Sequence, residues 1–352
     1  MRPYQSFITG GKFMKSKIRS VGAFVFAAGL LVAACGGSDS SSDSSSTKLK
    51  VFGAFATAKE EPWDGVIDAA LQAAADAGTI EYSSVDKIGY DGDMERVLRE
   101  TCQKDKPDVI FGDAFGNEEA VRKVAADCLD TAFVFGSGNG PTEPNVSVFD
   151  NWIHEPAYLA GMLAGGLTKS NKIGIVGAMP IPEVNRLANA FIAGAQSVNP
   201  SVEVKVTFIN SFFDPATAKE AALAQIAAGV DVIYAERAGV IEAAAEKGIL
   251  AFGNMSDQSS IAPDTVVTSA VWNMVPTVAY VLDQVAKGAY SAQDLKDFSM
   301  MGKGGASLAP INEKLVPADL LKKVQDQLAL IQGGGFRVDI NEGQPAGSVQ
   351  AG

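Results

Sequence analysis

The chain has 352 residues, of which 47% are apolar, so it is long enough to bury the cores of two domains of about 150 residues each. Its 41 acidic and 29 basic residues give a net charge of −12. An acidic surface repels nucleic-acid phosphates and anionic lipid headgroups, which excludes nucleic-acid binding and membrane attachment through a basic patch.

The N-terminal segment has the pattern of an export signal. A basic cluster precedes the apolar run Val21–Ala34, which is too short to span a hydrocarbon core of about 30 Å. Small residues then lead to Cys35, in a pattern that resembles the lipobox of bacterial lipoproteins. It predicts that residues 1–34 are a signal peptide and that Cys35 is lipidated and becomes the mature N-terminus. Translation can start at Met1 or at Met14, which directly precedes the basic cluster.

The segment after Cys35 predicts how the mature protein is attached. Residues 35–48 are rich in Gly, Ser and Asp, so they cannot bury apolar surface and are expected to form a flexible tether. Without the leader, 24 basic residues stand against 41 acidic ones, a net charge of −17. Because this charge is repelled by anionic lipids, we expect the lipid on Cys35 alone to hold the exported protein at the outer face of the membrane.

From Leu49 onward, segments with the length of strands alternate with segments of helical periodicity. The predicted strands are Leu49–Phe55, Val109–Gly112, Ala132–Gly136, Lys172–Ala178, Val202–Ile209, Val230–Ala235 and Ile249–Gly253. The predicted helices are Trp63–Ala77, Asp93–Gln103, Glu118–Cys128, Glu155–Leu167, Glu183–Val198, Ala216–Ala228, Val240–Glu246, Val275–Ala286 and Pro317–Ile331. Continuous Val/Ile/Phe strands are typical of parallel sheets covered by helices on both faces, which predicts an α/β fold.

Residues that favour helix ends agree with these boundaries. Pro62 directly precedes one predicted helix and Pro215 lies in the first turn of another. Asp214 is a suitable N-cap. Gly229 and Gly248 follow helix ends, where a left-handed residue is favoured.

The alternation restarts near Asn151, which predicts two doubly wound lobes. We expect lobe 1 to contain residues 49–150 and about 270–300, and lobe 2 to contain residues 151–269 and about 301–345. Such lobes are joined by several chain crossings, and they bind a ligand where the carboxyl ends of both sets of strands face each other.

The residues needed for catalysis or for a transition metal are scarce. His154 is the only histidine, and its position at the start of a predicted helix favours a solvated surface site. We therefore expect no enzyme activity, no metal and no cofactor. Cys102 and Cys128 each fall near the end of a predicted helix, and the sequence leaves open whether they form a disulfide or remain two thiols.

Aromatic, amide and acidic residues recur just after the predicted strands. The candidate ligand-binding residues are Phe55, Trp63, Asp113, Phe115, Asn151, Trp152, Met179, Phe212, Glu236, Met255, Asp257 and Trp272. Such residues favour a flat heteroaromatic ligand, since stacking on an aromatic side chain contributes about 1–3 kcal/mol per face. Phe115 and Phe213 are the aromatic residues for which packing in the core is the strongest alternative.

Several stretches resemble the basic membrane protein family of lipoproteins, which are receptors of the purine nucleoside type. These stretches are His154–Gly165, Lys172–Gly177, Gly194–Ala195, Val198–Pro200, Ser211–Asp214, Gly229–Ile233 and Ser256–Gln258. The resemblance implies a type I periplasmic-binding-protein fold, delivery to an ABC permease and a purine-type ligand held between aromatic side chains.

Position by position, the resemblance implies a modified ligand site. Trp63 falls where the family has a stacking Phe, and Phe212 matches the opposing aromatic residue. Met255 replaces the Asp that contacts the ribose in the family's nucleoside receptors, and Trp272 replaces a Lys that helps to bind the ligand. Since both polar sugar contacts are lost, we expect a nucleobase to bind in preference to a nucleoside.

The leading hypothesis is thus a monomeric, lipid-anchored receptor that closes around a purine-like ring and presents it to a membrane permease. One alternative is a surface lipoprotein with a signalling or partner-binding role. Another is a receptor for a different flat small molecule.

Overall fold

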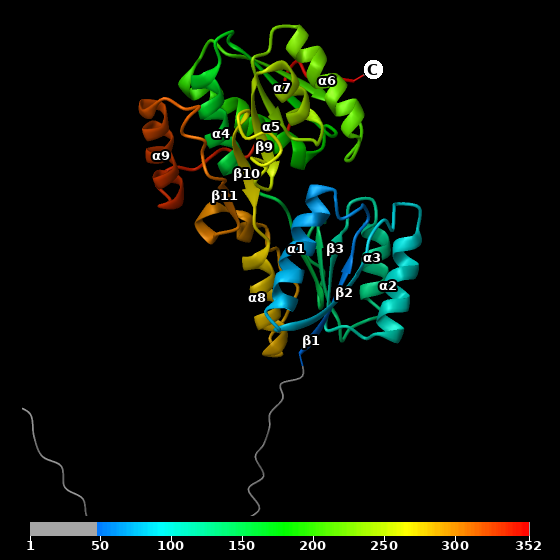
Figure 1. The fold of residues 1–352 in the computed structure, drawn as a ribbon. Coiled ribbons are helices and arrows are strands. Elements are labelled where there is room, and N and C mark those ends of the chain that lie inside the picture. The colour runs from blue at the N-terminus through cyan, green and yellow to red at the C-terminus, as the bar shows by residue number, and fades with distance from the viewer. Residues whose placement is uncertain (1–47, 352) are drawn as a thin grey trace, which may run out of the picture. The chain divides into compact units, whose positions relative to one another are not determined.

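The computed structural model describes residues 48–351 (Figure 1). The predicted signal peptide with both candidate start sites, the lipidation site Cys35 and nearly all of the predicted tether lie outside these residues. Within the described range, no helix is long and apolar enough to cross a membrane.

The first sheet is parallel throughout and has the strand order β2-β1-β3-β4-β5. Its strands are β1 (Leu49–Ala54), β2 (Ile80–Val85), β3 (Val109–Asp113), β4 (Ala132–Gly136) and β5 (Val146–Phe149). Helices α1 (Pro62–Asp76) and α8 (Val275–Ala286) cover one face, and α2 (Asp93–Lys104) and α3 (Glu118–Ala125) cover the other (Figure 1). We call this sheet with its four helices lobe 1.

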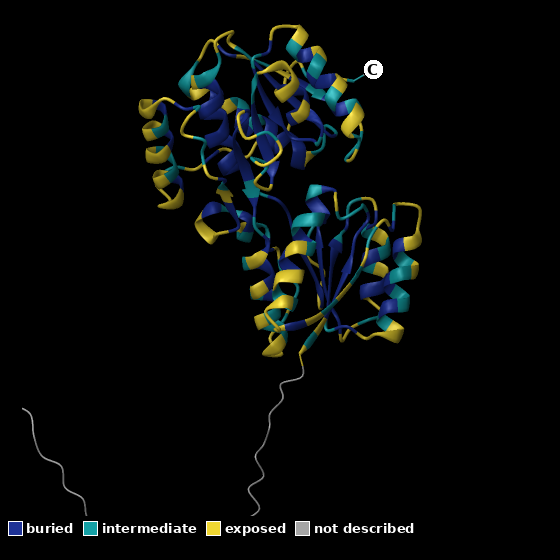
Figure 2. Cartoon of the chain, in the orientation of Figure 1, coloured by how far each residue is buried: buried dark blue, intermediate teal, exposed yellow. Residues whose placement is uncertain are grey.

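The burial of strand β3 on both faces explains why the strands of this sheet are continuous apolar runs in the sequence. Successive side chains of a strand point to opposite faces of the sheet. Val109 and Phe111 pack in one core with Leu71 of α1, whereas Ile110 packs in a second core with Met94 of α2. Because both faces are covered, the central strands are buried along their length (Figure 2).

The second sheet has the order β11-β10-β9-β8-β6-β7-β12, and β11 is antiparallel to its neighbour. Its strands are β6 (Lys172–Gly177), β7 (Glu203–Phe208), β8 (Val232–Ala235), β9 (Leu250–Met255), β10 (Val266–Trp272), β11 (Ala306–Leu308) and β12 (Val349–Gln350). Its helices are α4 (His154–Leu167), α5 (Pro182–Val198), α6 (Pro215–Ala227), α7 (Val240–Lys247) and α9 (Ala318–Gln332). We call this sheet with its helices lobe 2.

Glycines allow α4 and α5 to approach each other closely. A Cβ atom at Gly161 would overlap the main-chain carbonyl of Phe191, and one at Gly194 would overlap that of Tyr158. A larger residue at either position would therefore push the two backbones apart. This contact gives a physical role to two of the stretches that carry the family resemblance.

The chain passes between the lobes more than once. It enters lobe 2 after β5, returns to lobe 1 after β10 to form α8, and then goes back to form β11, which pairs with β10. The segment after α8 is tied to lobe 1, because the Leu295 N–H donates to the Val148 carbonyl at 2.7 Å. Any movement of one lobe relative to the other must therefore bend all of these connections together.

The predicted strands and helices are present, and most of their ends agree within two residues. The end predicted for α3 is wrong, because the helix stops at Ala125 and not at Cys128. The sequence pattern does not predict strands β2, β5, β10, β11 and β12. In β2 only Ile80 is buried, as expected for an edge strand, and so the segment lacks a continuous apolar run.

The predicted helix-end residues are confirmed. The Asp214 carboxylate accepts a hydrogen bond from the Thr217 N–H at 3.0 Å, and Pro215 is the first residue of α6. Gly229 and Gly248 have φ angles of 96° and 68°.

The surface position expected for His154 is wrong. This residue does begin a helix, but its side chain is only 1% exposed, because α4 is buried along nearly its whole length. Burial lowers the pKa of His154 to about 4, so the imidazole is neutral at physiological pH.

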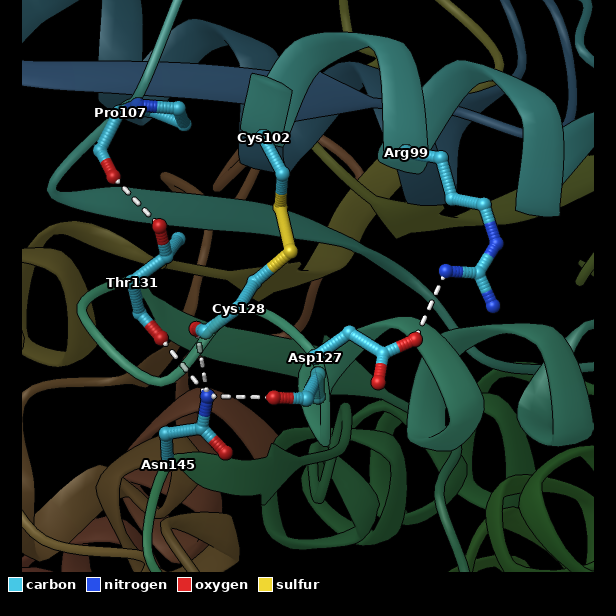
Figure 3. Close-up of a disulfide and its surroundings, with 8 residues drawn as sticks. Arg99, Cys102, Pro107, Asp127, Cys128, Thr131 and Asn145 are labelled. Atoms are coloured by element: carbon cyan, nitrogen blue, oxygen red, sulfur yellow. Dashed lines mark hydrogen bonds and ion pairs between the residues drawn. A yellow bond between two sulfur atoms is a disulfide. The ribbon is translucent and has the colours of Figure 1, made fainter.

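Cys102 and Cys128 form a disulfide in the structure, with their Cα atoms 6.3 Å apart (Figure 3). The bond joins the last turn of α2 to the loop after α3. The neighbouring loop is held by Asn145, whose side-chain N–H groups donate to the Ala125, Cys128 and Thr131 carbonyls, each at 3.0 Å. The disulfide thus closes one end of the α2–α3 layer.

We expect replacement of both cysteines by alanine to lower the free energy of unfolding by about 3–4 kcal/mol, since the cross-link restricts the unfolded chain over a separation of 26 residues. Urea denaturation of the variant and of the oxidised parent protein measures this difference. The reduced parent should unfold like the variant. Equal stability of all three forms would show that the bond does not contribute.

Candidate functional site

A small cavity lies between the carboxyl ends of the two sheets. Lobe 1 lines it with Thr57, Glu61, Trp63, Asp64, Tyr90, Asp113, Phe115 and Ser137, and lobe 2 lines it with Ile181, Glu183, Phe212 and Arg237. Its volume is about 20 Å³, which is room for one or two water molecules. The lobes are therefore closed on each other, and a ligand the size of a purine requires them to separate or their side chains to move.

The start of α1 positions the lobe 1 side of the cavity. Glu61 caps this helix, and its Oε2 accepts hydrogen bonds from the N–H groups of Trp63 and Asp64. Asp64 Oδ2 accepts from the Thr57 N–H at 2.9 Å and from its hydroxyl at 2.6 Å. Pro62 at the first helical position favours this geometry. The cap thus directs three consecutive functional groups, a carboxylate, an indole and a second carboxylate, towards the cleft.

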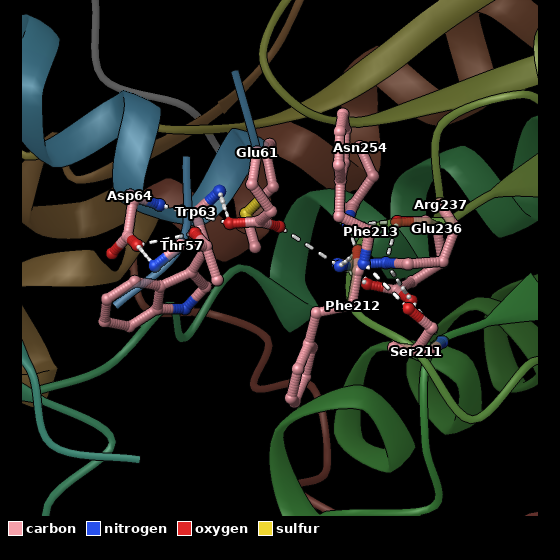
Figure 4. Close-up of polar contacts among 12 residues, drawn as sticks. Thr57, Glu61, Trp63, Asp64, Ser211, Phe212, Phe213, Glu236, Arg237 and Asn254 are labelled. Atoms are coloured by element: carbon pink, nitrogen blue, oxygen red, sulfur yellow. Dashed lines mark hydrogen bonds and ion pairs between the residues drawn. The ribbon is translucent and has the colours of Figure 1, made fainter. Parts of the chain in front are cut away.

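Arg237 connects the two lobes. Its Nη1 donates to Glu61 Oε1 of lobe 1 at 3.1 Å and to the Phe212 carbonyl of lobe 2 at 2.8 Å (Figure 4). Its Nε donates to Glu236 Oε2 at 2.9 Å and its Nη2 donates to Glu236 Oε1. All three charged side chains are buried, so the ion pairs are shielded from solvent.

Burial shapes the protonation of the cavity carboxylates. It raises the pKa of Asp64 to about 7 against the opposing hydrogen bonds from Thr57, and it raises that of Glu183 to about 8 with help from the nearby Glu236 carboxylate. The pKa of Asp113 lies well above its ordinary value for the same reason. In Glu61, burial also raises the pKa, and the Arg237 charge opposes this effect.

Aromatic side chains form two groups at the cavity. The Trp63 ring stacks on Phe149 with centroids 5.8 Å apart, and it contacts Trp272 at 5.1 Å. The Phe115 ring of lobe 1 meets Phe212 of lobe 2 edge to face at 5.2 Å. Aromatic side chains from both lobes thus meet at the cavity.

Two polar atoms of the cavity lining have no partner among the described residues. They are the indole Nε1 of Trp63, a donor, and Oδ1 of Asp64, an acceptor. Both side chains are more than nine-tenths buried. An unpaired buried polar group is costly, so these atoms favour a ligand that offers one acceptor and one donor.

Four of the sequence-predicted residues line the cavity, namely Trp63, Asp113, Phe115 and Phe212. Four others lie just behind the lining. Glu236 accepts hydrogen bonds from Arg237, and Trp272 packs on Trp63. Asn151 donates to Glu183 and also contacts the sulfur of Met255 at 3.5 Å. Asn151, in the connection after β5, therefore lies beside the cavity.

The remaining predicted residues are not part of the lining. Phe55 is fully buried in the lobe 1 core. The Arg186 guanidinium lies over Trp152, 5.5 Å from the centroid of the Trp152 ring. Met179 is half-buried, and Asp257 is exposed and accepts a hydrogen bond from the Ser259 N–H. For Phe115 and Phe213 the alternative was packing in the core; the structure places Phe115 in the cavity lining and leaves Phe213 45% exposed.

The candidate residues chosen from the sequence do not include most polar residues of the lining, namely Thr57, Glu61, Asp64, Tyr90, Ser137, Glu183 and Arg237, nor the apolar Ile181. Glu61, Asp64, Ile181 and Arg237 do lie in the segments after β1, β6 and β8, where the sequence predicts functional side chains. Glu183 lies in the first turn of α5 and looks like an ordinary helix-start acid. Tyr90 and Ser137 carry no sequence signal beyond their place in loops.

We expect Arg237→Met to lower the free energy of unfolding by about 3–5 kcal/mol, since it leaves Glu61 and Glu236 buried without a counter-charge. Urea denaturation measures this loss. Arg99→Met is the matched control, because Arg99 forms its ion pairs at the surface, and it should cost about 0–1 kcal/mol. Equal effects of the two substitutions would contradict a buried inter-lobe ion pair.

Comparison with known proteins shows which family the chain resembles. A family model for the PnrA-like ABC transporter substrate-binding proteins matches residues 52–297. A protein of Haloferax volcanii named as an ABC transporter glucose-binding protein is 34% identical over 257 residues, 71% of this chain and 65% of its own length. A purine-binding protein of Brucella abortus is 32% identical over 260 residues, 72% of each chain.

A solved structure supports the same fold. The ABC transporter solute-binding protein of Conexibacter woesei superposes with a TM-score of 0.67 at 22% identity, and the match covers 83% of this chain and 99% of that chain. The type I periplasmic-binding-protein fold expected from the sequence is confirmed, and these relatives bind solutes and are not enzymes. The chain belongs to the Bmp family of PnrA-like ABC transporter substrate-binding proteins.

Proposed function

We propose that this protein is the lipid-anchored receptor of an ABC importer, and that it closes its two lobes around a purine-type ligand, with a nucleobase preferred over a nucleoside. It then presents the closed form, as a monomer, to a membrane permease. The observation that carries the proposal is the pair of aromatic groups from opposite lobes, Trp63 and Phe212, in a cleft that also holds carboxylates.

The side chains at two positions support the preference for a base. Met255 and Trp272 stand where the family's nucleoside receptors have the Asp and the Lys. Met255 is buried against Asn151, and the indole N–H of Trp272 is committed to the Ser299 hydroxyl at 2.9 Å. Neither side chain offers a free polar group to a ribose, so a sugar there would lose hydrogen bonds that it makes in water.

Closure follows from contacts that the ligand makes with both lobes. A ring stacked on Trp63 contacts lobe 1, and the same ring reaches Phe212 and Glu183 of lobe 2. A ligand that binds both lobes stabilises the closed state relative to the open one, and a permease can recognise that state. The Haloferax relative supports a second candidate, a sugar ligand, because that protein is named as glucose-binding.

A calorimetric panel of purine bases, their nucleosides and glucose tests the ligand class. We expect a base to bind with a dissociation constant of about micromolar order, and its nucleoside to bind at least about tenfold more weakly. A nucleoside that binds more tightly than every base would overturn the base preference. Tightest binding of glucose would overturn the purine class, and no binding by the whole panel would favour the signalling alternative.

The aromatic contacts are tested with Trp63→Ala and Phe212→Ala. Each should weaken base binding by about 1–3 kcal/mol, because each removes one stacking face. Phe213→Ala is the matched control, since its ring is adjacent in sequence but largely exposed, and it should change affinity little. If all three variants bound the base like the parent protein, the ring would not lie between Trp63 and Phe212.

The lipid anchor is tested through the cysteine that would carry it. In cells, Cys35→Ser should move the exported protein from the membrane fraction to the soluble fraction, because no acyl chain can be attached. Fractionation and immunoblotting measure this shift. A variant that stays in the membrane fraction would contradict anchoring through Cys35.

A further inference from the structure

The cavity between the lobes has far more acidic than basic groups. Four carboxylate side chains line it, those of Glu61, Asp64, Asp113 and Glu183. Within residues 48–351, Arg237 is the one cationic side chain in the lining. Such a site, when fully ionised, is strongly negative in a region of low dielectric constant.

Arg237 does not compensate this excess. Its guanidinium is bound to Glu61, to Glu236 and to the Phe212 carbonyl. It therefore shares its single charge between two carboxylates that it already contacts. Asp64, Asp113 and Glu183 make no ion pair among the described residues, so their charge is left for protons or for a ligand.

Unpaired atoms in the lining point independently to a ligand. Asp64 is 1% exposed; Thr57 donates twice to one of its carboxylate oxygens, and the other, Oδ1, has no partner in the described part of the chain. Glu183 accepts a hydrogen bond from Asn151 through Oε1. Asp113 Oδ1 accepts from the Phe115 N–H at 2.9 Å. Carboxylate oxygens in this setting require N–H or O–H donors from the ligand.

The surroundings of these groups raise the cost of leaving them charged. Asp64 is close to the Glu61 and Asp86 carboxylates, and Asp113 is close to Asp64 and Glu183. The charged groups that face Glu183 are Glu236, Asp150, Arg237 and Arg186. Tyr90, which also lines the cavity, adds no compensating positive charge. Protons therefore occupy part of the site at neutral pH while no cation is bound.

We propose that this cleft selects a flat ligand that carries positive charge on a nitrogen-rich group, an amidinium or a protonated amino-heterocycle, and that Asp64, Asp113 and Glu183 determine this specificity. The inference rests on the proposed function, because it uses the same cleft and the same stacking residues. It adds a preference that a purine-type shape alone does not impose, and we call this preference the charge requirement: a neutral ring still binds, but a cation of the same shape binds more tightly. An anionic ring of equal shape is rejected by the unpaired carboxylates.

Binding of such a cation changes the protonation of the site. A carboxylic acid group of Asp64 or Glu183 loses its proton to solvent, and the resulting carboxylate binds the ligand cation. Affinity for a permanent cation should therefore rise between about pH 6 and about pH 9, through the pKa values of about 7 and about 8. A neutral ring that displaces no proton should bind equally well over this range.

Benzamidine, benzamide and benzoate test the charge requirement, because they share one flat shape and differ in charge. Isothermal titration calorimetry at about pH 8 should show benzamidine binding at least about tenfold more tightly than benzamide, with no detectable binding of benzoate. Titration in two buffers of different ionisation enthalpy should show proton release with benzamidine only. Equal binding of benzamidine and benzamide, or failure of benzamidine to bind, would overturn the proposal.

Substitutions of Asp64 and Glu183 test whether these two residues cause the charge requirement. Asp64→Asn and Glu183→Gln should each weaken benzamidine binding about tenfold and flatten its pH dependence, because each removes one carboxylate that pairs with the ligand cation. Glu119→Gln and Asp264→Asn are matched controls, since both side chains are exposed outside the cleft. Thermal melting identifies any variant that does not fold. If one of Asp64→Asn and Glu183→Gln does not fold, the other one tests the charge requirement. Folded variants that keep the parent's pH dependence would overturn the assignment.

The benzamidine experiment and the purine panel can fail independently of each other. Tight binding of purine bases without any preference for benzamidine would overturn the charge requirement alone. A clear benzamidine preference without binding of any purine would overturn the purine class and leave the charge requirement standing.

Discussion

The buried guanidinium of Arg237 holds together the two halves of the cleft. It is 5% exposed and is held between Glu61, the cap of the first helix in lobe 1, and Glu236, which follows β8 in lobe 2. A buried ion pair of this kind adds little net stability compared with apolar packing, but loss of one partner leaves a charge in low dielectric. The interaction therefore specifies how the lobes meet more than it strengthens the fold.

This constraint links helix capping to ligand binding. Glu61 uses one oxygen for the N–H groups at the start of α1 and the other for Arg237. A movement of the lobes that pulls Arg237 away also frees one oxygen of this cap. The neighbouring Trp63 and Asp64, whose backbone N–H groups are bound by the same carboxylate, can then be exposed to an incoming ligand. Ligand binding thus has to offset the loss of one buried pair.

The sequence predicts the parts of the fold that depend on burial from both sides. Strand β3 is recognisable because Val109, Ile110 and Phe111 enter two different cores. Strand β2 is not, because an edge strand needs only one buried face. The same distinction applies to the site: Trp63 and Phe212 follow strand ends and carry a strong aromatic signal. Glu183 gives no such signal, since an acid in a first helical turn is common on any exposed helix.

The sequence does not predict which residues far apart in the chain contact each other in the fold. Glu236 and Arg237 are adjacent in the chain, but only the folded structure shows that Arg237 reaches Glu61, which lies 176 residues earlier. Likewise, neither cysteine indicates its partner, and the disulfide depends on where α2 and the loop after α3 come to lie. Both facts depend on the distance between elements, which local periodicity does not encode.

Met255 shows how the cleft can lose two charged groups without a penalty. Its φ angle is 68°, a left-handed conformation in which Asp and Asn are enriched and a long apolar side chain is unusual. The backbone therefore suits the Asp that the family's nucleoside receptors carry there, while the side chain fills space beside Asn151. With Trp272 in place of the Lys, both charges are absent together, so neither is left buried and unpaired. In the proposed complex with a base, Asp64, Asp113 and Glu183 are the carboxylates of the lining that the N–H groups of the ring would meet.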